Sequence, residues 1–307
     1  MKEDIREIKR IDIHAHANPF PQFAPYYPQG CRYVSPEEVV ELYDKLNVEH
    51  GILLPLASAE GQYGMITSED CAYGASMYPE RLWWFCMVDP RMGEHSPTAD
   101  LSKYLMHYKN LGAKGCGELI SQMYLDHPMV DNLFYHCAAC DMPVTIHLAP
   151  QIGGYYGVVD ELGLPRLERA LKKHKKLKIL GHSQLFWAEI SADITEEGRR
   201  GYPKGKISEP GRITQLLREY ENLYCDLSAG SGANALKRDP DHAARFIEEF
   251  ADRLLYGIDY TMTNNNHQTL LCDFLVEMTV NGYVSYENYY KIVRGNALRL
   301  FDIENNY

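Results

Sequence analysis

The chain has 307 residues, of which 45% are apolar and 24% charged, as is typical of a globular protein with a sizeable core. Its formal net charge of −11 argues against a nucleic-acid or anionic-membrane surface, because such surfaces need clustered Lys and Arg. The amino-terminal stretch MKEDIREIKR alternates charges, and no segment approaches the roughly 20 apolar residues that span a bilayer. We therefore expect a cytoplasmic protein that binds neither membrane nor nucleic acid.

Short apolar runs alternate with amphipathic ones along the whole chain. The apolar runs are rich in Ile, Leu and Val, as strands buried on both faces are, and lie at 10–16, 51–56, 82–88, 113–118, 144–148, 177–182, 223–227 and 254–259. Helical patterns begin after an N-cap at Ser35 and recur at 101–110, 129–140, 167–174, 213–220, 243–250, 269–278 and 286–300. This alternation predicts α/β architecture, a single (β/α)8 TIM barrel over residues 1–307.

An open doubly wound sheet is the alternative to a barrel. It would be expected to carry a Gly-rich phosphate loop, and neither GxGxxG nor GxxxxGK[ST] follows any predicted strand. The one long irregular stretch, 183–210, is predicted to be a loop insertion after the sixth strand. A loop of this length inside a compact domain is usually functional or disordered.

Polar side chains close several of the apolar runs. The motif IDIHAH at 11–16 places His14 and His16 two residues apart, and side chains two apart on a strand share a face. His147, His182 and Asp259 end later runs, where barrel enzymes carry their chemistry. Four histidines and a carboxylate that meet at one rim would be costly to bury without a metal. The pattern therefore predicts a metal-dependent enzyme.

This arrangement resembles the amidohydrolase superfamily, and within it the amidohydrolase-related family that includes aminocarboxymuconate semialdehyde decarboxylase. The resemblance covers nearly the whole chain, through IDIHAH (11–16), GAKG (112–115), MPVTIH (142–147), LGHS (180–183), YCDLS (224–228) and GNALRLF (295–301). It implies that a metal is bound by His14, His16, His147 and Asp259. It also implies that His182 lies near the substrate as a catalytic group.

Two features depart from the family pattern. The family often has Gly-Ser-Asp at the eighth strand, whereas this chain has Gly-Ile-Asp at 257–259 and lacks the hydroxyl. Glu118 ends the fourth predicted strand, where binuclear branches of the superfamily carry a bridging Glu or modified Lys. Glu118 either bridges two metals, with His147 and His182 sharing the second ion, or pairs with a cation at the rim. The sequence leaves both open.

The chemistry follows from the charge of the metal. Three imidazoles and one carboxylate leave an open position for water, which a divalent ion acidifies toward neutral pH. We expect one or two Zn²⁺ ions, although Mn²⁺, Fe²⁺ and Ni²⁺ accept the same ligands. Our interpretation is a metal-dependent hydrolase of a small organic substrate, in which Asp259 is the general base and His182 polarises or protonates the substrate. The alternatives are a non-oxidative decarboxylase on the same metal site and a catalytically silent barrel that binds a metabolite or partner.

Weaker candidates lie in the loops that follow the strands. For each, a structural role in packing, capping or solvation stands beside the functional one. The tyrosine content suits either a polar aromatic pocket or the subunit interface of a homo-oligomer. These candidates are an aromatic wall at Phe186 and Trp187, hydrogen-bonding groups at Asp226, Ser228 and 264–267, a carboxylate clamp at Arg199 and Arg200, and the rim residues Tyr155, Tyr156 and Tyr260.

Overall fold

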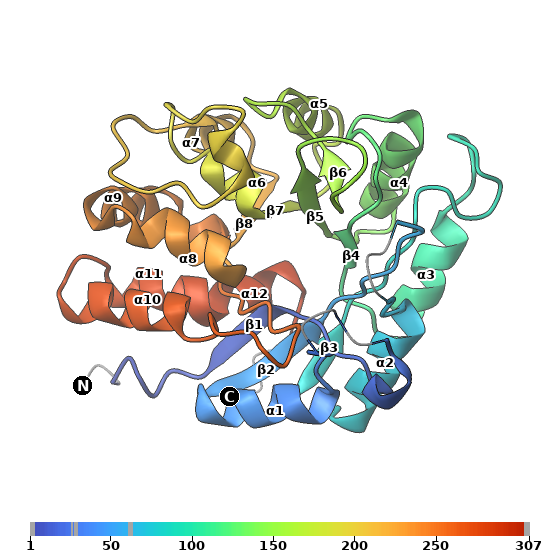
Figure 1. Cartoon of the computed structure of the whole chain (residues 1–307), viewed down its shortest axis with the longest axis horizontal. Coiled ribbons are helices and arrows are strands. Elements are labelled where there is room, and N and C mark those ends of the chain that lie inside the picture. Colours follow the sequence, from blue (N-terminus) through green and yellow to red (C-terminus); the bar gives the residue numbers. More distant parts are fainter. Residues whose placement is uncertain (1–3, 26, 28–29, 61–63, 304–307) are drawn as a thin grey trace.

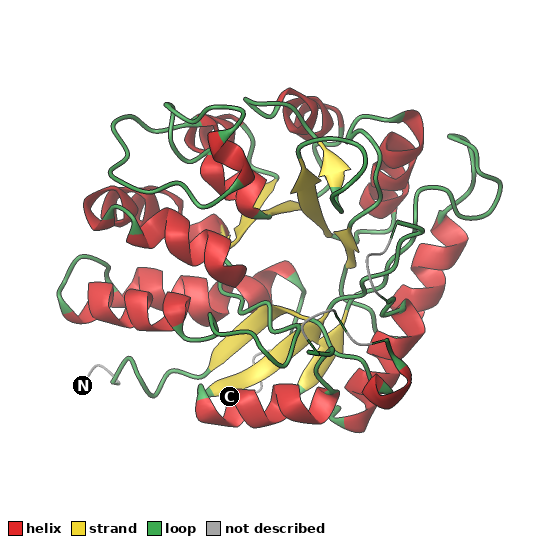
Figure 2. Ribbon diagram, in the orientation of Figure 1, coloured by secondary structure: helices red, strands yellow, loops and turns green. Residues whose placement is uncertain are grey.

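The computed structural model describes residues 4–25, 27, 30–60 and 64–303. Strands surround a central axis and helices form a ring outside them (Figures 1 and 2). The barrel wall consists of β1 (Arg10–Ala15), β2 (Val48–Leu53), β3 (Leu82–Trp84), β4 (Cys116–Leu119), β5 (Val144–Ala149), β7 (Ile179–His182), β8 (Leu223–Asp226) and β9 (Leu254–Leu255). This confirms the predicted (β/α)8 barrel.

The wall is built from two parallel sheets that meet at two seams. Within the sheets the order is β1-β2-β3 and β4-β5-β7-β8-β9, and the short strand β6 (Val158–Val159) pairs with β5 outside this path. At one seam Cys86 N–H donates to Gly115 O at 3.0 Å, and at the other Asp259 N–H donates to His14 O at 2.7 Å. These bonds close the wall into a barrel, which excludes the open doubly wound alternative.

Helices cover the outside of the barrel, and the predicted ones are present to within a few residues. Ser35 begins the first as expected, because Ser35 Oγ accepts from Glu38 N–H at 3.3 Å while the Glu38 carboxylate accepts from Ser35 N–H at 2.8 Å. Within the described ranges, no helix has both the length and the apolar character needed to cross a bilayer. The helices are α1 (Pro36–Lys45), α2 (Ser68–Met77), α3 (Ser102–Asn110), α4 (Pro128–Ala139), α5 (Pro165–Lys173), α6 (Gln184–Ala188), α7 (Arg212–Glu219), α8 (Ala229–Lys237), α9 (Pro240–Phe250), α10 (Leu270–Val280), α11 (Tyr286–Tyr290) and α12 (Asn296–Leu300), with a π-helical turn (Lys291–Gly295) joining the last two and 3-10 turns at Pro21–Phe23, Gly198–Arg200 and Ala251–Arg253.

The structure corrects several sequence-based boundaries. Helices α2 and α8 were not predicted, because their small and Gly-containing segments show no clear apolar stripe. Strands β3 and β9 end at Trp84 and Leu255, before their apolar runs do. The stretch 183–210 is not wholly irregular, since it contains α6 and a 3-10 turn at Gly198–Arg200.

Apolar side chains close the amino-terminal end of the barrel. Ile11, Phe85 and Leu180 pack with Leu300 and Phe301 at the end of the last helix, and the Phe85 and Phe301 ring centroids are 5.4 Å apart. This plug is a packed core. It leaves the opposite, carboxyl end of the strands for polar side chains, as in other barrels of this type.

Candidate metal centre

Strand β1 brings His14 and His16 together at its carboxyl end, where their Nε2 atoms are 3.0 Å apart. The preceding Asp12 instead contacts the helix layer, and its Oδ2 accepts from Tyr43 OH at 2.8 Å. Its Oδ1 accepts from His14 N–H at 2.9 Å. The pairing of β1 with β2 shifts register after Asp12. The strand is therefore irregular just where it turns the two imidazoles toward the site.

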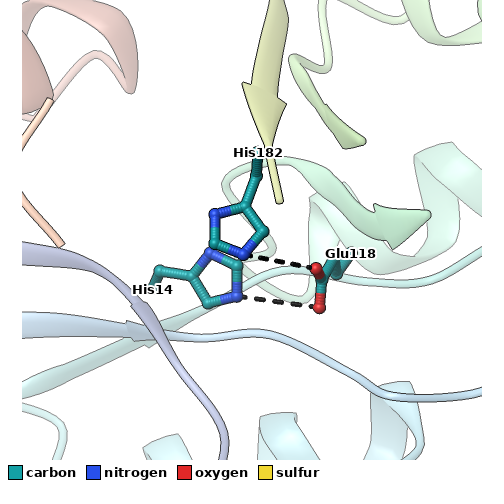
Figure 3. Close-up of side chains that lie close together, drawn as sticks. All are labelled: His14, Glu118 and His182. Atoms are coloured by element: carbon teal, nitrogen blue, oxygen red, sulfur yellow. Dashed lines mark ion pairs between the residues drawn. The ribbon is translucent and has the colours of Figure 1, made fainter. Parts of the chain in front are cut away.

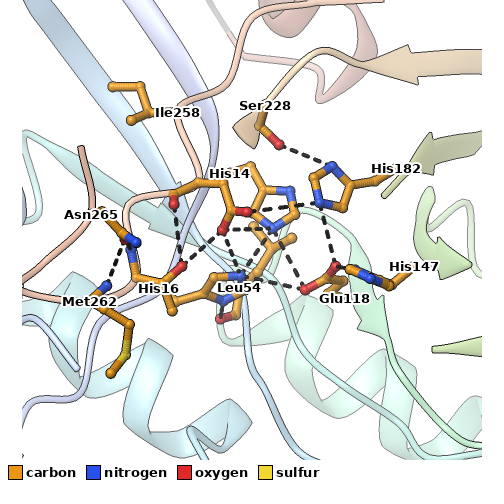
Figure 4. Close-up of polar contacts among 12 residues, drawn as sticks. His14, His16, Leu54, Glu118, His147, His182, Ser228, Ile258, Met262 and Asn265 are labelled. Atoms are coloured by element: carbon orange, nitrogen blue, oxygen red, sulfur yellow. Dashed lines mark hydrogen bonds and ion pairs between the residues drawn. The ribbon is translucent and has the colours of Figure 1, made fainter. Parts of the chain in front are cut away.

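Glu118, at β4, lies between two pairs of histidines (Figure 4). Its Oε2 is 3.4 Å from His16 Nε2 and 3.7 Å from His14 Nε2. Its Oε1 accepts a hydrogen bond from His147 Nδ1 at 2.5 Å and is 3.8 Å from His182 Nε2. Figure 3 shows this carboxylate reaching both His14 and His182. Each carboxylate oxygen thus faces one pair of imidazoles.

Asp259 follows β9 and lies across the site from Glu118. Its Oδ1 is 3.4 Å from His16 Nε2 and 3.8 Å from His14 Nε2, and its Oδ2 is 3.9 Å from His182 Nε2. Thr261 Oγ1 donates to Oδ1 at 2.9 Å. The φ angle of +60° places Asp259 in the left-handed region, which a non-glycine residue adopts only when its surroundings hold it there.

Two residues, Asp226 at the end of β8 and Ser228 just after it, contact the histidines on the side away from Glu118. Asp226 is fully buried, and its Oδ2 accepts from His14 Nδ1 at 2.6 Å. Its Oδ1 accepts from Ser228 N–H at 2.9 Å, and Ser228 Oγ is 3.1 Å from His182 Nδ1. Both side chains therefore contact the ring nitrogens that face away from Glu118. Sequence reasoning singled out both residues but did not assign them this role.

The electrostatics of the site favour a positive charge at its centre. Burial lowers the pKa of His14, but Asp226 and Asp259 outweigh it and raise that pKa well above its ordinary value. Burial raises the pKa of Glu118, yet the neighbouring histidines hold it well below its ordinary value. Burial, with His14 beside it, lowers the pKa of His182 to about 4. Buried carboxylates around imidazoles are the environment that binds a cation.

The donor set fits a divalent metal. Ligand bonds of about 2.1 Å in a tetrahedral site place the donor atoms about 3.4 Å apart. The Nε2 atoms of His14 and His16 lie 3.4 to 3.8 Å from Glu118 Oε2 and Asp259 Oδ1. His14, His16 and Asp259 form one compact donor group, and His14, Glu118 and His182 form another. His147 lies outside both groups in its contact with Glu118, so its role as a ligand stays a prediction.

A cavity of about 270 Å³ opens over this centre, with His16, Glu118 and Asp259 among its lining residues. Tyr27, Tyr33 and Tyr156 line it beside the apolar Leu56, Ile120 and Met262. The loop at 264–267 does not cap the following helix, which begins after Thr269; Asn265 and His267 line the cavity and brace the turn after Asp259, so a role in binding stays a prediction. Asn265 Oδ1 accepts from Thr261 N–H at 2.9 Å, and His267 Nε2 bonds Asp259 O at 3.1 Å.

Other sequence candidates lie away from this cavity. Phe186 and Trp187 belong to the core, and Trp187 Nε1 donates to Asp226 O at 2.8 Å, so of their two predicted roles the structure supports packing and not an aromatic wall of the cavity. Arg199 is fully buried 3.6 Å from Glu189, so it is neither a solvated charge nor a lining residue of the cavity. Arg200 donates to Gln151 Oε1 at 3.2 Å.

A comparison with known protein families shows to which family the chain belongs. A family model described as Amidohydrolase matches residues 11–303, nearly the whole chain. The chain belongs to the amidohydrolase family. The resemblance seen in the sequence motifs is thereby confirmed. No curated protein matched the chain in sequence.

Solved structures with a similar fold include a decarboxylase and a protein named as a probable hydrolase. An uncharacterized TIM-barrel protein from Bordetella bronchiseptica is 18% identical with a TM-score of 0.62, over 96% of this chain and 99% of that one. The 2,6-dihydroxybenzoate decarboxylase from Rhizobium is 16% identical with a TM-score of 0.59, over 96% and 99%. A protein named as a probable 2-pyrone-4,6-dicarboxylic acid hydrolase from Acinetobacter baumannii is 15% identical with a TM-score of 0.57, over 96% and 100%. At these identities the likeness concerns the fold alone.

Proposed function

We propose that the protein is a metal-dependent hydrolase in which water attacks a carbonyl-type bond of a small organic substrate. The observation that carries the proposal is Glu118, with one carboxylate oxygen toward His14 and His16 and the other toward His147 and His182. A carboxylate in this position can bridge two ions, and paired ions serve hydrolases by holding both the attacking and the leaving oxygen. We propose Zn²⁺ as the ion, with Mn²⁺, Fe²⁺ and Ni²⁺ as alternatives for the same ligands.

When bound, such a metal would lower the pKa of a water toward neutral and polarise a carbonyl. Asp259 acts as general base, since Thr261 Oγ1 holds its Oδ1 at 2.9 Å and its Oδ2 faces the site. His182 is neutral at neutral pH, because burial and His14 lower its pKa to about 4. His182 Nδ1 lies 3.1 Å from Ser228 Oγ and 3.5 Å from Asp226 Oδ2, and its Nε2 faces Glu118. In the two-ion site Nε2 would ligate the second ion, whereas in a one-ion site it would be free to carry a proton to the substrate carbonyl.

A non-oxidative decarboxylase is the second candidate. His14, His16 and Asp259 form a donor group without Glu118, which would suffice for one ion. His182 would then deliver a proton to the carbon that loses carbon dioxide. The fold neighbours support both reactions equally, since one is a 2,6-dihydroxybenzoate decarboxylase and another is named as a pyrone hydrolase. The number of ions is the property that separates the two candidates.

Metal analysis of the Glu118→Gln variant tests the proposal. We expect two zinc ions per wild-type chain and no more than one in the variant, because an amide cannot bridge two cations as a carboxylate does. Glu189→Gln is the matched control, since Glu189 is also 2% exposed but contacts Gly163 N–H and Arg199 away from the site. A His14→Ala variant should lose the metal altogether.

The reaction itself is tested with zinc-loaded protein against panels of esters, lactones and amides, and separately against aromatic acids with carbon dioxide trapped. Hydrolysis that Glu118→Gln abolishes and Glu189→Gln preserves supports the proposal. One ion per chain in the wild type, unaffected by Glu118→Gln and accompanied by carbon dioxide release, would replace it with the decarboxylase.

A further inference from the structure

A tyrosine outside the predicted ligand set is placed against the centre. The ring centroid of Tyr156 is 4.3 Å from that of His147, at an interplanar angle of 40°. Gly157 makes this placement possible, because its φ is +114° and a Cβ there would lie 2.5 Å from His147 O. Gly157 N–H also donates to Ile120 O at 2.9 Å. The backbone at Gly157 thus holds the Tyr156 phenol against the imidazole of His147, which points toward the metal centre.

The hydroxyl of Tyr156 has no hydrogen-bond partner among the residues that the structure describes, although Tyr156 lines the cavity beside Glu118 and Asp259. A phenol hydroxyl is protonated at neutral pH, so it can donate a hydrogen bond. A confined donor that its own protein leaves unpaired is suited to an acceptor on a ligand.

Among the residues that the structure describes, the lining of this cavity contains neither Lys nor Arg. Arg32, near in sequence to the lining residues Tyr27 and Tyr33, donates to both carboxylate oxygens of Glu38. A substrate carboxylate on the side of the ring away from the metal ligands would be partly desolvated in this cavity, and no Lys or Arg of the described lining would pair with it.

We propose that this site takes an uncharged, single-ring carbonyl compound, and that the Tyr156 hydroxyl donates the hydrogen bond that orients it. The inference rests on the proposed function, because the reacting carbonyl is assumed to face the metal ligands. The inference narrows the substrate class of that function from small carbonyl compounds in general to those without a free carboxylate. The ring packs against Leu56, Ile120 and Met262, and the cavity of about 270 Å³ has room for one such ring.

Binding of two matched aryl ketones to zinc-loaded protein tests this inference. The probes are 4-nitroacetophenone and 4-acetylbenzoate, which have nearly the same shape and differ in charge, and neither contains an ester, lactone or amide bond that the proposed hydrolase could cleave. By calorimetry we expect the nitro compound to bind at least about tenfold more tightly, since an unpaired buried carboxylate is costly. Tyr156→Phe should weaken binding of the nitro compound about fivefold, the value of one ordinary hydrogen bond. The control Tyr135→Phe, on an α4 side chain that is 62% exposed, should leave both affinities unchanged.

Three results would overturn the inference: tighter or equal binding of the benzoate, no binding of the nitro compound, or unchanged binding of the nitro compound in Tyr156→Phe with zinc content intact. The design also separates this inference from the proposed function. If the nitro compound binds preferentially through Tyr156 but no neutral ester, lactone or amide is hydrolysed, the inference stands and the hydrolase proposal fails.

Discussion

The Asp226→Asn substitution probes how the fold prepares His14 to bind a metal. Asp226 Oδ2 accepts from His14 Nδ1 at 2.6 Å, while Oδ1 accepts from Ser228 N–H at 2.9 Å. Asparagine has one accepting oxygen, so it cannot serve both donors. Either the amide nitrogen opposes Ser228 N–H, or it donates to His14 Nδ1 and forces the ring proton onto Nε2, the atom that faces the metal site.

Loss of a carboxylate behind a ligating histidine typically weakens metal binding by about 10- to 100-fold, or about 1.4 to 2.7 kcal/mol. We expect a decrease in this range, since the Asp226 side chain is fully buried and no solvent can replace it. The assay is competition for zinc with a chromophoric chelator, at constant pH and with the metal-free protein first shown to be folded by circular dichroism.

Asp239→Asn provides the matched control. Asp239 is also a buried carboxylate with backbone partners, accepting from His242 N–H at 3.1 Å and Ile207 N–H at 2.9 Å, but it caps α9 away from the centre. It should lose stability without losing zinc affinity. An Asp226→Asn protein with wild-type zinc affinity would refute the orienting role that we assign to Asp226.

Three further predictions follow from separate features. At pH 7 zinc binding should release protons, because the pKa of His14 is raised and its imidazole must lose a proton to bind the metal. Zinc affinity should therefore fall as the pH falls. Calorimetry in buffers of different ionisation enthalpy should show a buffer-dependent heat of binding, and a heat independent of the buffer would contradict this prediction. Gly157→Ala should lower the free energy of unfolding, measured in urea, by more than about 2 kcal/mol. The alanine Cβ would clash with His147 O, and the φ of +114° at this position strains any residue with a side chain. A variant as stable as the wild type would count against this contact. Ser35→Ala should cost about 1 kcal/mol in thermal unfolding through loss of the Glu38 capping box, whereas an unchanged midpoint would show that the cap contributes nothing.

Local patterns were sufficient for the barrel but not for every element in it. Strand β5 follows from a short run rich in β-branched and apolar residues, and helix α1 follows from a capping box, both of which are short-range properties. Helix α8 forms on a Gly-containing segment with little intrinsic preference, because packing against the barrel stabilises it. Helix α2 does begin with a capping box, Thr67 with Asp70, but its apolar residues form no clear stripe. The apolar run at 254–259 predicts one regular strand, yet its pairing with β8 ends at Leu255, and residues 256–260 bond to β1 instead, with Asp259 N–H donating to His14 O.

By itself, the sequence determined the fold class, the family motifs and the identity of the polar residues that end the strands. Only the tertiary structure decided how those residues are shared: Glu118 between two pairs of imidazoles, Asp226 behind His14 instead of in the cavity, and Tyr156 against His147. The physical reason is that a strand's hydrophobic pattern reports which segments are buried, whereas hydrogen-bond partners at a barrel rim depend on the register of strands far apart in the chain.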